Sequence, residues 1–386
     1  MMELNIGMIG YSFMGKAHSN GFRQLPAFFP ELDVKPVLKV ICGRNLDAVK
    51  DAAETYQWEE YETDWEKVIA RDDIDVIDIC TPGDQHLPMA LAALKAGKHV
   101  ICEKPLTNTL AEARELLTVA ESTNKKTMVA FNYRRVPAVA LARQLIAEGR
   151  IGEIYHWRAV YLQDWIIDPD FPLVWRLEKD KAGSGPHGDL NAHIIDLALH
   201  LVGDIDSVVG ADTTFIKERP LLEAVDGGLG AQGGEQMGQV TVDDATMFLA
   251  RFQNGALGTF EATRFAAGRR NYNHFEINGS KGSIAFNLQK MNELQFYSRD
   301  DEDHIQGFRE IIVGEGSQPF MGAWWPPGHI IGWEHTFTHE FRDFFEAIAQ
   351  DGTFSPDFAE GTKVQAVLES VVDSAATKTW QDVPKI

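Results

Sequence analysis

The first 131 residues alternate short apolar runs with segments of helical periodicity. The apolar runs are read as strands at Leu4–Ile9, Val37–Cys42, Val76–Cys80, His99–Cys102 and Thr127–Phe131. Runs that are apolar throughout, rather than at every second position, are typical of parallel strands covered by helices on both faces. The pattern predicts an α/β domain with a doubly wound parallel sheet over residues 1–131.

The pattern changes after Asn132, where the strand-like runs alternate apolar and polar residues. They lie at Ile154–Tyr161, Ser207–Thr213, Ala245–Phe252, Ala256–Arg264, His274–Gly279, Gly282–Asn287 and Glu293–Tyr297. Such alternation predicts an α+β domain over residues 132–386, with a large open, mostly antiparallel sheet. The glycine-rich segment Leu222–Gly238 is predicted to be a long loop. The C-terminal helices, Thr338–Gln350 and Thr362–Lys378, could pack back on the first domain.

The chain carries a formal net charge of −21. Nucleic acid and an anionic membrane surface are therefore disfavoured as partners, because both would be repelled. Cys42, Cys80 and Cys102 lie at or near the ends of apolar runs, which favours small buried residues over metal or redox centres. No metal site is expected. Unpaired thiols, with neither a signal peptide nor a membrane-length apolar run, predict a cytoplasmic protein.

The segment Gly10-Tyr11-Ser12-Phe13-Met14-Gly15 directly follows the first strand and opens a helix. It matches the dinucleotide fingerprint G-x-G-x-x-G, with Ser12 in place of the middle glycine. A helix N-terminus offers free backbone N–H groups to a pyrophosphate, and small residues let the backbone approach it. The serine hydroxyl could bind a phosphate as well. The segment therefore predicts a dinucleotide cofactor.

The second strand ends at Cys42-Gly43-Arg44-Asn45. An acidic residue here would bind the ribose 2′-hydroxyl of NAD, but the nearest is Asp47. Arg44 could pair with the 2′-phosphate of NADP, stack on adenine, or face solvent. Both NAD(H) and NADP(H) remain open, with a slight preference for NADP(H).

Polar residues also follow the next two strands, at the edge where open α/β sheets bind ligands. Lys104, within Glu103-Lys104-Pro105, follows the strand His99–Cys102. Thr81-Pro82 follows the strand Val76–Cys80 and precedes a helix whose backbone N–H groups could meet a phosphate. His86 lies nearby, and the sequence favours a structural role and a contact with the cofactor equally for this histidine.

Asp189 and His193 are four residues apart on a predicted helix, Gly188–Leu201, and so share one face. An imidazole of near-neutral pKa can take a proton from an alcohol, and a carboxylate can orient it. The alternative is a surface aspartate beside a half-buried histidine. The pair could also ligate a metal, but further ligands at suitable spacing do not stand out.

The segment Tyr161-Leu162-Gln163-Asp164-Trp165 ends a strand with polar side chains beside aromatic ones, and Trp175-Arg176 follows a proline-rich loop. Aromatic faces beside hydrogen-bonding groups suit a sugar ring, whereas core packing is the alternative for the tryptophans. Asn132-Tyr133-Arg134 ends the last strand of the first domain and borders the same crevice.

Taken in order, these motifs resemble the Gfo/Idh/MocA family, the relatives of glucose–fructose oxidoreductase and inositol 2-dehydrogenase. The resemblance covers essentially the whole chain, and Glu103-Lys104-Pro105 followed by Asp189-x-x-x-His193 is its most specific part. The stretches Phe131–Arg135, Tyr161–Trp165 and Ala182–Gly185 look most like the levoglucosan dehydrogenase subgroup. Ser12 departs from the family pattern, as does Gly83, which replaces the asparagine of T-P-N-x-x-H.

The resemblance implies an NAD(P)-dependent sugar dehydrogenase that oxidises a ring hydroxyl, at C3, of a sugar, anhydrosugar, glycoside or cyclitol. It implies that residues 1–131 form an NAD(P)-binding Rossmann domain, and that the chain forms a homodimer or homotetramer through the C-terminal sheet. Two alternatives are a redox-neutral glycoside-cleaving enzyme that works through a transient 3-keto sugar, and a non-catalytic NAD(P)-sensing regulator.

The resemblance and the motifs together assign site residues to three roles. The expected catalytic residues are Lys104, Asp189 and His193. The expected cofactor contacts are Gly10, Ser12, Phe13, Met14, Gly15, Arg44, Thr81, Pro82, His86, Glu103, Lys104, Asn132 and Arg176. The expected substrate contacts are Lys104, Tyr133, Arg134, Tyr161, Gln163, Asp164, Trp165, Asp189 and His193.

Overall fold

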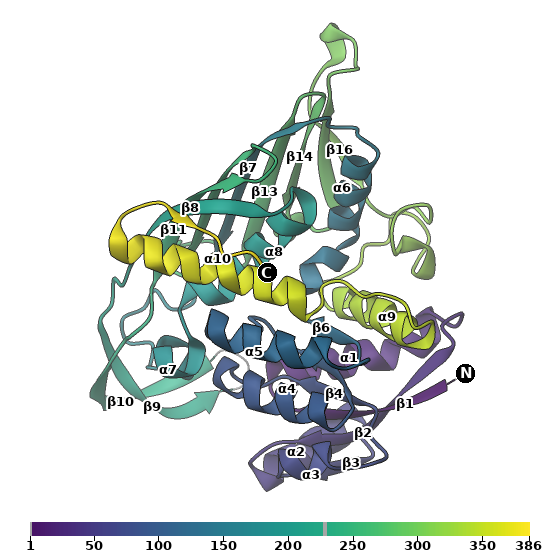
Figure 1. Ribbon diagram of the computed structural model, residues 1–386, viewed down its shortest axis with the longest axis vertical. Helices are drawn as coiled ribbons and strands as arrows, with labels where there is room; N and C mark the ends of the chain where they lie inside the picture. Colours follow the sequence, from purple (N-terminus) through teal and green to yellow (C-terminus); the bar gives the residue numbers. More distant parts are fainter. Residues whose placement is uncertain (1, 227–229) are drawn as a thin grey trace. The chain divides into compact units, whose positions relative to one another are not determined.

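The computed structural model describes residues 2–226 and 230–386 (Figure 1). The chain divides into two compact units, Met1–Asn132 with Gly332–Thr362, and Tyr133–Ile331 with Lys363–Ile386. The chain thus returns to its first unit near its end, a possibility that the sequence left open for the C-terminal helices. Within the described residues, no helix is long and apolar enough to cross a membrane.

The described part of the first unit contains a six-stranded parallel sheet in the order β3-β2-β1-β4-β5-β6. Its strands are β1 (Met2–Ile9), β2 (Val34–Cys42), β3 (Glu60–Glu62), β4 (Val76–Ile79), β5 (His99–Cys102) and β6 (Thr127–Val129). The predicted doubly wound sheet is confirmed. The strand order reverses between β1 and β4, and such a switch point opens a crevice at the carboxyl ends of the strands. The sequence missed β3, whose three residues, Glu-Tyr-Glu, form no apolar run.

Helices connect and cover this sheet. They are α1 (Phe13–Phe28), α2 (Leu46–Tyr56), α3 (Trp65–Ile69), η1 (Gly83–Gln85), α4 (His86–Lys95), α5 (Leu110–Glu121), α9 (His335–Ala349) and the first turn of α10 (Phe358–Thr377). Right-handed crossovers place the helices of the two halves on opposite faces of the sheet. The returning helix α9 packs on α1, where the rings of Phe22 and Phe341 stack with their centres 4.1 Å apart.

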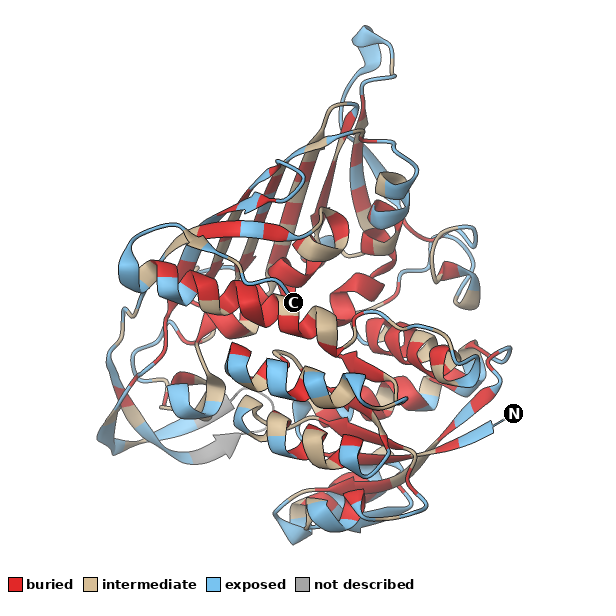
Figure 2. Cartoon of the chain, viewed as in Figure 1, coloured by how far each residue is buried: buried red, intermediate tan, exposed pale blue. Residues whose placement is uncertain are grey.

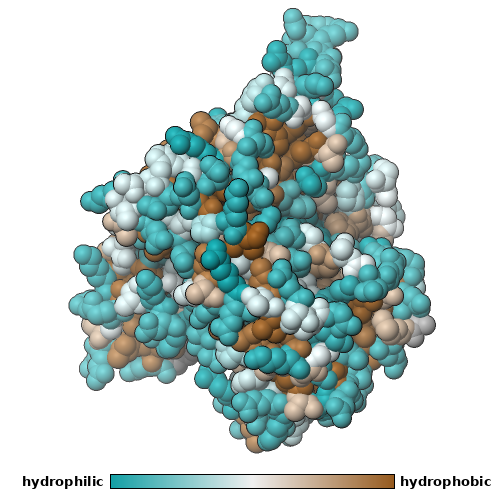
Figure 3. Space-filling view, viewed as in Figure 1, coloured by the Kyte–Doolittle hydropathy of each residue, from teal (hydrophilic) through white to brown (hydrophobic). Residues whose placement is uncertain are grey.

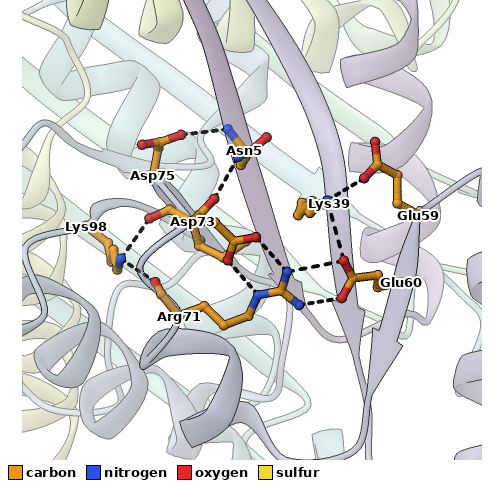
Figure 4. Close-up of polar contacts among 9 residues, drawn as sticks. Asn5, Lys39, Glu59, Glu60, Arg71, Asp73, Asp75 and Lys98 are labelled. Atoms are coloured by element: carbon orange, nitrogen blue, oxygen red, sulfur yellow. Dashed lines mark hydrogen bonds and ion pairs between the residues drawn. The ribbon is translucent and has the colours of Figure 1, made fainter.

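Polar contacts hold the amino-terminal edge of the same sheet (Figure 4). Arg71 forms ion pairs with Glu60 at 2.6 Å and with Asp73 at 2.8 Å. The Lys98 ammonium donates to the backbone carbonyls of Arg71 and Ile74, at 2.7 and 2.8 Å. These contacts occupy the amino-terminal edge of the sheet. Ligands of such sheets bind at the opposite edge, where the carboxyl ends of the strands lie.

The described part of the second unit contains a nine-stranded sheet, in the order β16-β15-β14-β13-β7-β12-β11-β8-β17. The strands are β7 (Ile154–Leu162), β8 (Ile205–Thr213), β11 (Ala245–Phe252), β12 (Leu257–Thr263), β13 (Tyr272–Gly279), β14 (Gly282–Asn287), β15 (Glu293–Ser298), β16 (Arg309–Ile312) and β17 (Gln381–Asp382). Neighbours pair antiparallel except β7 and β12, which run parallel. The predicted mostly antiparallel sheet is confirmed.

One face of this sheet is covered by helices, and buried residues alternate with exposed ones along β11 (Figure 2). The helices are α6 (Pro137–Ala147), α8 (Ala192–Leu201) and the part of α10 from Lys363 onward. The Gly210 N–H of β8 donates to the Ser374 hydroxyl of α10 at 3.0 Å. On the uncovered face, Met247 and Leu249 remain about half exposed, at 51% and 49%.

The prediction of a loop over Leu222–Gly238 is wrong. Strands β9 (Glu218–Asp226) and β10 (Gly230–Gln239) pair antiparallel there, while residues 227–229 lie outside the described residues. A Cβ added at Gly233 would lie 2.6 Å from Pro220, and one at Gly238 would lie 2.7 Å from Leu221. These glycines mark close packing across a strand pair rather than a turn.

The nine-stranded sheet ends at β16, which leaves a strand edge unpaired in the described structure. The connection from β15 to β16 contains the acidic run Asp300–Asp303, and the tip of this hairpin is hydrophilic at the top of Figure 3. Charged side chains at a sheet edge disfavour pairing with other chains.

The contact between α1 and α9 can be tested at Gly21. A Cβ added there would lie 2.8 Å from the Phe341 ring. We expect Gly21→Ala to lower the free energy of unfolding by about 1–3 kcal/mol, because overpacking outweighs the helix propensity that alanine adds. Urea denaturation followed by circular dichroism measures the change. In a Phe341→Leu background, which makes room, the substitution should cost less; an unchanged cost would contradict the contact.

Candidate functional site

The turn from β1 to α1 accepts only glycine at two positions. Gly10 has a φ of 109°, and a Cβ there would lie 2.5 Å from the Cys80 carbonyl oxygen. A Cβ at Gly15 would lie 2.2 Å from the Gly10 carbonyl oxygen. Ser12 caps α1, but its side chain makes no capping hydrogen bond in the described structure. The first-turn N–H groups and the serine hydroxyl are therefore placed to meet an anion, as a pyrophosphate requires.

An aromatic stack lies beside this turn. Phe13 is 47% exposed, and its ring stacks on Trp333 at 5.5 Å with an interplanar angle of 8°. The tryptophan belongs to the segment that returns to the first unit just before α9. The sequence singled out Phe13 but not Trp333, because nothing local links a residue so late in the chain to the first strand.

Carboxylates lie near the carboxyl end of β2. Arg44 is exposed, and the Asn45 side chain caps α2 by accepting from the Ala48 N–H at 3.0 Å. Glu62 of β3 is the register partner of Cys42. Burial raises the pKa of Cys42 to about 12, and the charges of Glu62 and Asp64 add to this shift. The surroundings of this strand end are thus negative, which disfavours a second phosphate.

Two loops at the carboxyl edge are tied together by His86. Its ring nitrogens lie 2.9 Å from the Thr81 carbonyl oxygen and 3.0 Å from the Pro105 carbonyl oxygen, and the residue is buried. The side chain thus holds the loops that carry Thr81-Pro82 and Lys104. Asn132, also buried, donates to the Thr336 hydroxyl at 2.8 Å. Both residues shape the edge on which a cofactor would lie.

In the second unit, Asp189 lies in a π-helical turn, η4 (His187–Asn191), that leads into α8. The sequence predicted a regular α-helix from Gly188, whereas the structure has a π-helical turn there and the α-helix begins at Ala192. Such turns occur frequently at functional sites. The Asp189 carboxylate forms an ion pair with Arg264, which follows β12 and is fully buried. The sequence did not single out Arg264.

His193 is buried between two tyrosine rings. Its ring centre lies 4.5 Å from that of Tyr133 and 5.9 Å from that of Tyr161. Burial, followed by the neighbouring Tyr133, raises the pKa of Tyr161 well above its ordinary value, so this phenol stays protonated. Aromatic packing on both sides therefore helps to hold the imidazole plane.

Four of the predicted substrate contacts, Tyr133, Tyr161, Gln163 and Trp165, are joined by one chain of hydrogen bonds. The Tyr133 and Tyr161 hydroxyls lie 2.8 Å apart, and Tyr161 donates to Asn271 Oδ1 at 2.8 Å. Gln163 Nε2 donates to the same oxygen at 2.9 Å, and Trp165 Nε1 donates to Gln163 Oε1 at 2.8 Å. Asn271 is the centre of this chain. The sequence missed it, because it lies in the irregular stretch between β12 and β13.

The remaining predicted residues fall into different surroundings. Arg134 is buried and forms an ion pair with Asp196 of α8 at 2.6 Å, which gives it a structural role; its substrate contact stays a prediction. Asp164 accepts from the Gly268 N–H at 2.9 Å, which braces the loop after β7 against that after β12. The Arg176 guanidinium lies 4.4 Å from the centre of the Trp175 ring.

Comparison with known proteins finds similarity along the entire chain. A model described as an oxidoreductase family with an NAD-binding Rossmann fold matches residues 4–131, and a GFO/IDH/MocA C-terminal domain model matches residues 139–285. The chain is 46% identical to the levoglucosan dehydrogenase of Pseudarthrobacter phenanthrenivorans, over 100% of both chains.

Solved structures agree with this similarity. A levoglucosan dehydrogenase in complex with NADH and levoglucosan matches with a TM-score of 0.95 and 44% identity, over 100% of both chains. An oxidoreductase domain protein from Kribbella flavida matches with a TM-score of 0.94 and 51% identity, also over 100% of both.

The ion pair of Asp189 can be tested by stability. Asp189→Asn leaves the buried Arg264 charge without its carboxylate, so we expect the free energy of unfolding to fall by about 2–3 kcal/mol. Glu178→Gln is the matched control, since the Glu178 and Asp189 side chains are both 35% exposed. Its partner Lys181 is 50% exposed, whereas Arg264 is 0% exposed. The control should change stability by less than about 1 kcal/mol; equal losses in chemical denaturation would contradict the assignment.

Proposed function

Because this chain belongs to the Gfo/Idh/MocA family of oxidoreductases, we propose that it oxidises the C3 hydroxyl of an anhydrosugar, with levoglucosan as the first candidate. The observation that carries the proposal is the full-length similarity to levoglucosan dehydrogenase. The polar and aromatic chain from Tyr133 to Trp165 supports it, since a sugar ring needs both kinds of contact.

The proposed cofactor is NAD, bound by the turn from β1 to α1. The glycine positions at Gly10 and Gly15 fit a pyrophosphate, as does the uncapped start of α1. Glu62 and Asp64 near the end of β2 would repel a 2′-phosphate. The preference for NADP suggested by Arg44 finds no support, whereas the levoglucosan dehydrogenase complex contains NADH.

The proposed catalytic residues are Lys104, Asp189 and His193. His193 takes the proton of the C3 hydroxyl, and Lys104 donates a hydrogen bond to the same oxygen as charge develops on it. When bound, NAD accepts the hydride from C3, which leaves a ketone. Asp189 contributes its charge from within the ion pair with Arg264.

We expect levoglucosan to reduce NAD in the presence of the protein, with NADP as the poorer acceptor. Lys104→Ala should lower kcat by about 100-fold or more, because a donor to the developing charge is lost. Absorbance at 340 nm measures turnover, and NMR of the product identifies the 3-keto sugar. Lys95→Ala, at an exposed lysine of α4, controls for loss of a positive charge.

Full turnover by Lys104→Ala would overturn the assignment of Lys104. Failure of the wild type to oxidise levoglucosan and a panel of related sugars would overturn the proposed function. The redox-neutral alternative would appear as glycoside cleavage without accumulation of NADH. The regulatory alternative would appear as NAD and sugar binding without turnover. No specific observation favours either of them.

The uncovered face of the nine-stranded sheet is proposed as the contact between copies of this chain. It holds a hollow of about 390 Å³ whose lining includes Val209, Met247, Leu249 and Thr259. Met247 and Leu249 are half exposed, and Leu257 is 55% exposed. Exposed apolar residues gathered on a sheet face are typical of association surfaces.

The proposed location is the cytoplasm, and the free thiols of Cys42, Cys80 and Cys102 accord with a reducing compartment.

Substitution at this face tests the assembly. We expect Leu249→Lys to shift the protein from a dimer or tetramer toward a monomer, because a charge would be buried in an apolar contact. Analytical ultracentrifugation measures the mass. Ile305→Lys, at an exposed apolar residue on the hairpin tip, is the control and should leave the mass unchanged. A wild type that sediments as a monomer would contradict the proposal.

A further inference from the structure

A buried polar cluster lies in the core of the first unit, beneath the loop that carries Lys104. It consists of His18 on α1, Asp78 on β4, Cys80 after β4 and Glu103 after β5, and is called the His18 cluster below. His18 Nδ1 lies 3.0 Å from Asp78 Oδ2, and His18 Nε2 lies 3.1 Å from Glu103 Oε1. The three charged or chargeable side chains His18, Asp78 and Glu103 are buried.

The two contacts of the imidazole define its protonation. An ionised carboxylate only accepts hydrogen bonds, and a neutral imidazole has a single N–H to donate. His18 faces a carboxylate at each ring nitrogen, and Cys80 Sγ also lies 3.3 Å from Nδ1. With both carboxylates ionised, only the imidazolium donates to both of them at once. Its charge also offsets one of two carboxylates that would otherwise be buried together.

The pKa of His18 accords with this geometry. Burial by itself would lower the pKa of His18, but Asp78, through its charge and hydrogen bond, and the neighbouring Cys80 raise the pKa well above its ordinary value. The ring is covered on other sides by aromatic residues. Phe22 lies edge-on at 6.4 Å, while α9 contributes Phe337 at 5.3 Å and Phe341 at 5.0 Å.

The donor atoms of His18, Asp78 and Cys80 all lie within 4.8 Å of one another, which also fits a metal ion. A metal would require an unprotonated imidazole nitrogen and a thiolate. Both ring nitrogens of His18 already face carboxylate oxygens, at 3.0 and 3.1 Å. A proton on each ring nitrogen therefore accounts for the cluster better than a metal does.

The cluster continues to Lys104. The second carboxylate oxygen of Glu103, Oε2, accepts the backbone N–H of Lys104 at 3.1 Å. The Glu103 N–H donates in turn to the Ile79 carbonyl of β4 at 2.9 Å. An unbroken series of contacts thus runs from Asp78 through His18 and Glu103 to the backbone of Lys104.

We propose that His18 is a positioning residue for the oxidation: as a buried imidazolium it orients Glu103, and Glu103 orients the backbone from which the Lys104 side chain extends. This inference rests on the proposed catalytic role of Lys104. His18 does not touch the reacting atoms, so its effect must pass through Glu103.

The test compares His18→Gln, Glu103→Gln and the double variant. His18→Gln removes the cation, and we expect kcat to fall about 10–100-fold, in the range caused by small displacements of a catalytic group. The KM for levoglucosan and the dissociation constant of NADH should change less than about threefold. In the Glu103→Gln background, the same substitution should cost little, since two residues acting in series are not additive.

His99→Gln is the matched control, because His99 begins β5 and its Nδ1 accepts the Lys126 N–H at 2.9 Å at the opposite edge of the sheet. It should retain wild-type kcat. A folded His18→Gln with wild-type kcat would overturn the inference, and so would additive losses in the double variant.

Protonation is tested without turnover. NMR of labelled histidine should show, at pH 8, one imidazolium resonance that His18→Gln lacks; a neutral His18 would overturn the inference.

The pH dependence of stability is a second test. Because the pKa of His18 is higher in the folded state than in the unfolded state, His18 stabilises the fold fully at pH values below its unfolded-state pKa. This stabilisation is lost as the pH rises through the folded-state pKa. The wild type should therefore lose its stability advantage over His18→Gln at alkaline pH. If the wild type oxidised no sugar, the proposed function would fail, while these two measurements would still decide the state of His18.

Discussion

Burial of a parallel sheet on both faces is the constraint on which the first unit depends. Parallel neighbours cannot be joined by tight turns, so each connection crosses over a face and every strand ends at the same edge. The sequence therefore places Gly10, Cys80 and Lys104, which follow different strands, at one edge of the sheet. Polar contacts around Arg71 stabilise the other edge. The residues proposed for function in this unit therefore lie in the loops at the carboxyl ends of the strands.

Both units use buried cations beside the residues proposed for function. Arg264 meets Asp189, Arg134 meets Asp196 in the middle of α8, and the His18 cluster lies below Lys104. A buried ion pair adds little net stability when it is compared with an apolar pair, but it allows few alternative arrangements. Such pairs are suited to holding side chains in fixed positions, which is what hydride and proton transfer require.

Local signals account for what the sequence predicted. Continuous apolar runs identified most strands of the first unit, alternation identified the second sheet, and the fingerprint with Glu103-Lys104-Pro105 identified the edge for ligands. Features set by distant contacts were missed. Trp333 reaches Phe13 only because the chain returns, Asn271 lies in an irregular stretch, and Arg134 is buried although its type favours exposure. In β10, Gly233 is needed because Pro220 of the neighbouring strand packs closely on it. In the sequence, such a glycine looks the same as a glycine of a loop.

The hydrogen-bond chain through Asn271 has a direction. Tyr161 uses its only hydrogen on Asn271, so the hydrogen between the two tyrosines must come from Tyr133. Gln163 gives its amide hydrogen to the same carbonyl, which leaves the Asn271 nitrogen pointing the other way. A sugar hydroxyl can either donate or accept a hydrogen bond. A surface whose donors and acceptors are fixed in direction fits only one of these roles at each position, so it can distinguish two epimers of equal size and polarity.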